Sequence, residues 1–155
     1  MAYLIDTNII LRMAQPTHPM CADALNALAV LREQKHDCYL AHQNLIEFWR
    51  SATRPVERNG LGMSLAQAQA ELQRLENLFL ILPDVAEIFP HWKRLVLEYG
   101  VMGVNVHDAR LVALMLVYGV SHILTFNLED FNRYSAEITP VSPTTPKEHG
   151  SVVAP

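Results

Sequence analysis

The stretch at residues 3–11 constrains the fold of this chain more than any other. Tyr3, Leu4 and Ile5 form a short apolar run typical of a buried strand, and Asp6 follows directly, before an apolar segment with helical character. Open α/β sheets bind their ligands at the carboxyl ends of strands, which is where we expect Asp6 to lie. The alternative is that Asp6 caps the helix by accepting backbone N–H bonds. The choice depends on which other residues converge on Asp6.

Short apolar runs alternate with segments of helical spacing along the chain. Besides the first, strands are predicted at 38–41, 79–82, 122–125 and 138–141, and helices at 7–14, 20–34, 42–53, 64–77, 84–99, 105–118 and 128–134. The continuous run at 79–82 predicts a fully buried strand, and Pro90 is expected to break or kink its helix. This alternation predicts a three-layer α/β/α fold with a central, mostly parallel sheet.

Length and composition fit one globular domain. Of 155 residues, 50% are hydrophobic and 18% are charged, which predicts a domain over residues 1–141 followed by a flexible, proline-rich tail over 142–155. The net charge of −4 provides no general attraction for nucleic acid, although bound cations would offset it at an acidic metal site. Cys21 and Cys38 lack metal-ligand spacing, and from the strand-like start of the sequence we expect neither a leader peptide nor a membrane-spanning run. We therefore expect a cytoplasmic protein without a membrane partner.

A second acid, Asp108, lies in a predicted helix that is apolar on nearly every side. Leu111, Val112 and Met115 follow it at i+3, i+4 and i+7 and so share its face. A carboxylate on such a face is costly unless a partner or a cation holds it. The alternative is an acid that complements the helix dipole in the first turn, worth a few tenths to about 1 kcal/mol. The apolar surroundings favour a site role.

Glu47 belongs to a helix whose apolar stripe is on the opposite side, so taken alone it fits a solvated face. Arg50 and Arg54 follow on the same helix. The acid and the two arginines could together face a cleft, because a guanidinium binds phosphate through its planar fork of donors.

Further polar residues, Asn127, Glu129 and Asp130, come directly after the strand predicted to end at Thr125. A turn capped by Asp130 explains them as well as a site does. If these acids meet, their repulsion requires a cation or a shared proton. Oxygen ligands suit Mg²⁺ or Mn²⁺ rather than zinc, and such a site supports attack of water on phosphate esters.

The order and setting of the acids resemble the PIN-domain ribonucleases, and above all the toxin component of VapBC-type toxin–antitoxin pairs. The matching segments span residues 3–131 and are Leu4-Ile5-Asp6-Thr7-Asn8, Asn44-Leu45-Ile46-Glu47, His107-Asp108-Ala109-Arg110-Leu111-Val112-Ala113 and Leu124-Thr125-Phe126-Asn127-Leu128-Glu129-Asp130-Phe131. Each motif is short, but four in this order are fairly specific.

This resemblance implies a PIN-like parallel sheet with Asp6, Glu47 and Asp108 gathering Mg²⁺ or Mn²⁺ at its carboxyl edge. It implies endonucleolytic RNA cleavage by a metal-activated water, with Thr7 or Asn8 helping to position the site. It also implies a homodimer and a small antitoxin whose C-terminal segment covers the acidic cleft.

One position departs from the commonest family pattern, because Asn127 stands where many members have Asp. Other members pair such an Asn with an Asp three residues later, as Asp130 is here. The fourth position is therefore open between Asn127 as a ligand and Asp130 acting mostly through water.

Three competing interpretations remain. A haloacid-dehalogenase-like phosphatase needs a second Asp where this chain has Asn8, and a receiver domain needs a Lys after a late strand, which the sequence lacks. A non-catalytic binding module of the same fold stays open, although the intact acids argue against it.

Overall fold

The computed structural model describes residues 1–144. It contains a five-stranded sheet in the order β3-β2-β1-β4-β5, and every neighbouring pair is parallel. The strands are β1 (Ala2–Ile5), β2 (Asp37–Ala41), β3 (Leu80–Leu82), β4 (His122–Leu124) and β5 (Thr139–Val141). The prediction of a central sheet is confirmed, and in the described residues it is entirely parallel.

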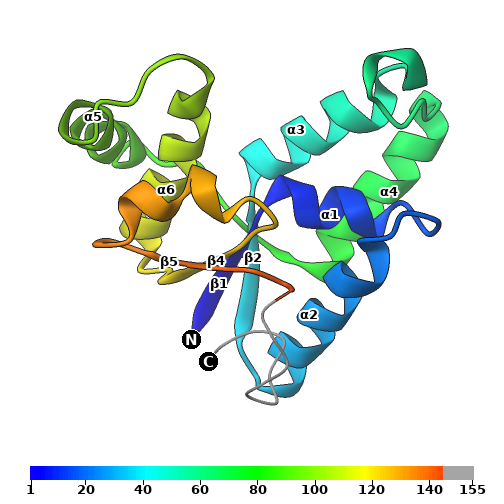
Figure 1. Cartoon of the computed structure of the whole chain (residues 1–155), viewed down its shortest axis with the longest axis horizontal. Coiled ribbons are helices and arrows are strands. Elements are labelled where there is room, and N and C mark those ends of the chain that lie inside the picture. The colour runs from blue at the N-terminus through cyan, green and yellow to red at the C-terminus, as the bar shows by residue number, and fades with distance from the viewer. Residues whose placement is uncertain (145–155) are drawn as a thin grey trace.

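Helices cover both faces of this sheet (Figure 1). They are α1 (Thr7–Met13), α2 (Cys21–Glu33), α3 (His42–Thr53), α4 (Leu65–Leu78), α5 (Ile88–Glu98) and α6 (Val106–Tyr118). Figure 1 shows α5 and α6 on one side of the sheet and α1 to α4 on the other. The fold is therefore the three-layer α/β/α arrangement that the sequence predicts.

The alternation of side chains along β1 explains the two layers. Tyr3 and Ile5 pack into one hydrophobic core with α1, α2 and α3, whereas Leu4 packs into a second core with α5 and α6. Successive strand residues point to opposite faces of a sheet, so a continuous apolar run is needed where both faces are covered. All three residues are fully buried.

Two expectations about the region at 79–99 are wrong. Phe79 is the C-cap of α4, and β3 is an edge strand in which the side chain of Leu80 is 67% exposed. The helix predicted from residue 84 begins only at Ile88. Pro90 therefore lies in the first turn of α5, where its missing N–H has no intrahelical acceptor to lose and does not break the helix.

Smaller differences concern short turns. The segment predicted as one helix at 128–134 forms two 3₁₀ turns, Leu128–Asp130 and Asn132–Tyr134. Two further 3₁₀ turns of the described residues are Val56–Arg58, after α3, and Gly103–Asn105, before α6. Most of the predicted tail, residues 145–155, lies outside the described residues. No helix within residues 1–144 has the length and apolar character required to cross a membrane.

The strand order places a topological switch point between β1 and β4. From β1 the chain proceeds to β2 and β3 on one side, and β4 and β5 extend the sheet on the other. Parallel sheets of this kind bind ligands outside the carboxyl ends of the strands at such a point. Asp6 follows β1 there, and Thr125 follows β4.

Candidate active site

Asp6 is the N-cap of α1 and also faces the other acids of the site. Its Oδ1 accepts a hydrogen bond of 2.8 Å from the backbone N–H of Thr7, so Asp6 does cap the helix. The cap uses only one of the two carboxylate oxygens of Asp6. Its Oδ2 accepts from Thr125 Oγ1 at 2.8 Å and from Asn8 Nδ2 at 3.3 Å. With 8% of its surface exposed, Asp6 is held in one orientation by three donors.

Asn8 fixes the loop after β4 to the start of α1. Its Nδ2 also donates to Thr125 Oγ1 at 3.1 Å, and its Oδ1 accepts from the backbone N–H of Phe126 at 3.2 Å. The same Thr125 hydroxyl accepts from the backbone N–H of Asn127 at 3.0 Å. Asn8 therefore links Asp6 to the residues after β4 through its side-chain amide.

Glu47 reaches the site from α3 and is held by Thr7. The hydroxyl of Thr7 donates to Glu47 Oε2 at 2.8 Å and accepts from Asn44 Nδ2 at 3.2 Å. Asn44 is fully buried, so this side of α3 is not the solvated face that its polar residues suggest. This side of α3 packs against α1, and that contact brings Glu47 beside Asp6.

Asp108 lies in the first turn of α6, half-buried, directly above the apolar part of that helix. Leu111, Val112 and Met115 on its face are buried, as the sequence predicts. Among the hydrogen bonds of residues 1–144, none is made by the Asp108 carboxylate. This acid is therefore held in place by its helix rather than by polar partners.

Asp130 ends the 3₁₀ turn that follows β4 and lines the same cleft as Asp108. Asn127 is exposed and is not among the residues that line the cleft. Of the two candidates for the fourth position, the structure thus brings Asp130 to the other acids.

These residues surround a cleft of about 620 Å³ between α3 and α6. The walls and floor are formed by Thr7, Gln43, Ile46, Glu47, Arg50, Ser51, Val104, Asn105, His107, Asp108 and Asp130. Asp6 is not among the lining residues, but it precedes Thr7 in the chain and its charge acts on Asp108. Residues far apart in the sequence therefore meet at the switch point of the sheet.

The two arginines of α3 have different positions. Arg50 is exposed and lines the cleft. Arg54 is not among the lining residues, and its Nη2 donates to the backbone carbonyl of Asn59 at 3.1 Å. Only Arg50 is thus placed beside the acids.

Crowding and burial raise the pKa values of two acids. Burial raises the pKa of Asp6 to about 6, the hydrogen bonds from Thr125 and Thr7 oppose this rise, and the charges of Glu47 and Asp130 add to it. Burial likewise raises the pKa of Asp108 to about 7, and the nearby acids, led by Asp6, add to that rise. Each acid is therefore costly to ionise without a cation.

The donor set fits a hard divalent cation by its chemistry. Within residues 1–144 no three His, Cys, Asp or Glu side chains form a ready-made metal-binding group. Asp6 and Asp108 nevertheless supply carboxylate oxygens with raised pKa values, and both would be stabilised in their ionised form by Mg²⁺ or Mn²⁺. Glu47 and Asp130 are near enough to influence both pKa values and would bind the ion directly or through water.

Three structural contributors were missed in the sequence: Gln43, Asn44 and Thr125. All are polar residues directly after a strand or within the first turn of the helix that follows it, which is the detectable signal. Asn44 and Thr125 are fully buried, and each has hydrogen bonds to site residues. Local sequence gave no sign of those partners, which are distant along the chain.

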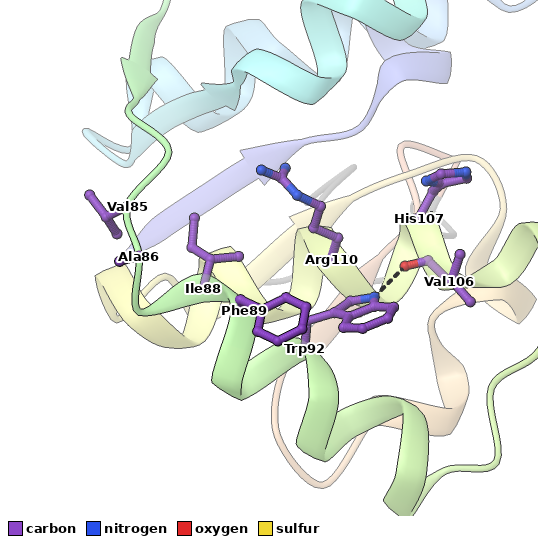
Figure 2. Close-up of a pocket in the computed structure, with 8 residues that line it drawn as sticks. All are labelled: Val85, Ala86, Ile88, Phe89, Trp92, Val106, His107 and Arg110. Atoms are coloured by element: carbon purple, nitrogen blue, oxygen red, sulfur yellow. Dashed lines mark hydrogen bonds between the residues drawn. The ribbon is translucent and has the colours of Figure 1, made fainter.

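An apolar pocket of about 430 Å³ adjoins the cleft (Figure 2). Phe89 and Trp92 of α5 stack against each other with ring centroids 5.6 Å apart, and the indole N–H of Trp92 donates to the carbonyl of Val106 at 2.9 Å. Phe89 is 63% exposed. His107 lines both the pocket and the cleft, so the two are neighbours on this side of α6.

The fold and cleft together define an α/β protein with an acidic site suited to a divalent cation. The family model of the PIN domain matches residues 3–137, and the chain therefore belongs to the PIN domain family. This confirms the family predicted from the order of the acids. No curated protein matches the chain significantly by sequence.

Several solved structures share this fold at low sequence identity. VapBC2 from Rickettsia felis, bound to a promoter DNA fragment, has a TM-score of 0.69 and 15% identity over 92% of this chain and 98% of its own. VapBC-1 from nontypeable Haemophilus influenzae has a TM-score of 0.65 and 16% identity over 94% and 100%. VapC20 from Mycobacterium tuberculosis, described as a toxin that cleaves the sarcin–ricin loop, has a TM-score of 0.62 and 14% identity over 88% and 96%. The resemblance to VapC toxins thus holds for the fold.

Proposed function

We propose that this PIN-domain protein is a metal-dependent endoribonuclease of the VapC toxin type. It would hydrolyse phosphodiester bonds of single-stranded or structured RNA in the cytoplasm. The observation that carries the proposal is that Glu47, Asp108 and Asp130 line one cleft while Asp6 lies close enough for its charge to raise the pKa of Asp108. Support also comes from the family match and from the similarity in fold to a toxin described as cleaving RNA of the sarcin–ricin loop.

Asp6 and Asp108 would hold Mg²⁺ or Mn²⁺ between the switch point and α6, with Glu47 and Asp130 as further ligands or as acceptors for bound water. Such an ion lowers the pKa of bound water and stabilises charge on the phosphate and the leaving oxygen. The protein's part is to fix the carboxylates in advance. The three donors to Asp6 and the Thr7 hydroxyl on Glu47 accomplish this.

Cleavage of RNA by purified wild-type protein with Mn²⁺ tests this function. We expect Asp6→Asn and Asp108→Asn each to lower the rate about 100-fold or more, since each removes a negative ligand from the site. Asp23→Asn is a matched control, because Asp23 also lies in the first turn of its helix, outside the cleft. Full activity in EDTA, or in Asp108→Asn, would refute the proposal. Metal-independent RNA binding without cleavage would instead support the non-catalytic module.

Arg50 is the cation that we place against RNA phosphate, and Arg54, the C-cap residue of the same helix, remains a second candidate. We expect Arg50→Ala to weaken RNA binding and to reduce its dependence on salt by about one phosphate contact. Arg54→Ala should act mainly on the loop that it holds through Asn59. Binding isotherms of the two variants between low and moderate salt decide between these roles. An unchanged salt slope in Arg50→Ala would exclude that phosphate contact.

An antitoxin is the protein partner that we propose for the cleft. The similar solved structures include VapBC complexes, in which such a toxin fold was crystallised with its partner. Here Ile46 and Val104 expose apolar surface on opposite walls of an acidic cleft. A segment combining apolar and basic side chains would match that surface by charge and hydrophobicity. We further propose a homodimer, which a measurement of molar mass in solution tests.

A further inference from the structure

Gln43 makes three side-chain hydrogen bonds at the edge of the cleft. One turn before Glu47 on α3, its Nε2 donates to Glu47 Oε1 at 2.8 Å and to the backbone carbonyl of His107 at 2.8 Å. Its Oε1 accepts from Arg110 Nη1 at 3.2 Å. The Gln43 amide thus binds Glu47 on its own helix and two residues, His107 and Arg110, of α6 on the opposite side of the cleft.

Arg110 connects this amide to the chain after β3. Its Nη2 donates to Asp84 Oδ1 at 2.9 Å, so the guanidinium bridges Gln43 and Asp84. Figure 2 shows the Arg110 side chain extending from α6 on the same side of the pocket as Val85 and His107. The bridge is partly exposed, with 35% of the Arg110 side chain accessible, so we expect it to add little to the free energy of unfolding. Its main effect is to fix the position of the Gln43 side chain.

The consequence for Glu47 is that both of its carboxylate oxygens are occupied. Thr7 donates to Oε2 and Gln43 to Oε1, each at 2.8 Å. A free Glu side chain on a helix samples several rotamers, and ordering it costs free energy when a ligand binds. A Glu47 that is already oriented avoids that cost.

We propose that Gln43, braced by Arg110, is a positioning residue that orients the Glu47 carboxylate for the cation. This inference rests on the proposed function, because it takes Glu47 as a ligand, direct or through water. Gln43 does not itself bind the ion. Its hydrogen bond to Glu47 orients that carboxylate, and its hydrogen bond to the His107 carbonyl connects α3 to α6 beside the cleft.

The test is the affinity for Mn²⁺ of the full chain, measured by calorimetry without RNA. We expect Gln43→Ala to weaken Mn²⁺ binding about 10-fold, as is typical when a group supporting a metal ligand is removed. Gln73→Ala is the matched control, because Gln73 donates to Asn77 at the same i, i+4 spacing on α4, away from the cleft. Its Mn²⁺ affinity should equal that of the wild type.

A double-mutant cycle separates positioning from a general loss of structure. Arg110→Met should weaken Mn²⁺ binding less than Gln43→Ala, and it should add little in the Gln43→Ala background, because both changes act through one hydrogen-bonded chain. Additive losses would overturn the bracing role of Arg110. Wild-type affinity in a folded Gln43→Ala protein would overturn the positioning role alone. A wild-type chain that binds no Mn²⁺ would overturn the proposed function and this inference with it.

Discussion

The two walls of the cleft hold their acids in opposite ways. At the switch point, Asp6 accepts three hydrogen bonds, caps α1 and is 8% exposed. On α6, Asp108 has the higher pKa and makes none of the side-chain hydrogen bonds found in residues 1–144. One acid is held by hydrogen bonds from the protein, and the other is half-buried at the start of an apolar helix without such bonds.

This difference separates two requirements of a cation site. The hydrogen bonds to Asp6 stabilise its ionised form and define where an ion would be held. Asp108 accepts no such hydrogen bond within residues 1–144, and the charge of Arg133 opposes the rise of its pKa without cancelling it. The cleft therefore combines a carboxylate fixed by hydrogen bonds with one whose ionised form a cation would stabilise further.

The largest expected effect is on the free energy of unfolding, which replacing Asp6 should lower and replacing Asp108 should not. Asp6→Ala should destabilise the protein by about 1–3 kcal/mol, because it removes the helix cap and leaves the donors of Thr7, Asn8 and Thr125 without their acceptor. Asp108→Ala should leave stability unchanged or raise it at pH 7, since a buried, repelled charge is lost. Urea unfolding in EDTA measures both. Equal destabilisation by the two variants would contradict the comparison.

The pH dependence of stability should reflect the same acids. An unfolded Asp titrates near about 3.9, whereas the folded pKa is about 6 for Asp6 and about 7 for Asp108. The folded protein thus binds more protons over this interval, and its stability should fall as the pH rises from about 4 to about 7. Melting temperatures in EDTA from pH 5 to 8 test this.

Asp108→Asn and Mn²⁺ provide the controls for that experiment. The variant should lose the part of the slope nearest pH 7 and keep the part due to Asp6. Added Mn²⁺ should stabilise the wild type more at pH 7.5 than at pH 5, because the ion binds the deprotonated carboxylates. A wild-type melting temperature that rises steadily from pH 5 to 7 in EDTA would show that the acids are not coupled as described.

The contrast also explains what could be predicted from sequence. Asp6 was recognisable because strand, acid and helix are adjacent in the chain, and Asp108 because the residues that bury it are on its own helix. Glu47 was ambiguous, since its neighbour Asn44 looks solvent-facing by periodicity but donates to Thr7, 37 residues away. Similarly, the run at 79–82 looks fully buried by its sequence, and only the strand order shows that β3 is the sheet edge. Local sequence patterns predict helices and strands, whereas the burial of Asn44 and the edge position of β3 depend on residues far away in the chain.

The smallest expected effect concerns a single donor to Asp6. Thr125→Val keeps the shape of the side chain but removes the O–H that donates to Asp6 Oδ2 at 2.8 Å. This hydrogen bond lowers the pKa of Asp6, so the variant should shift the acidic limb of the cleavage profile to higher pH. The variant also removes the acceptor of Asn8 Nδ2 and of the Asn127 backbone N–H, so we expect a loss of about 1–2 kcal/mol of stability. Thr53→Val is the control, because Thr53 donates to the carbonyl of Trp49 on α3, away from the acids. An identical pH profile in wild type and Thr125→Val, with both proteins folded, would mean that Asp6 is no better anchored than Asp108.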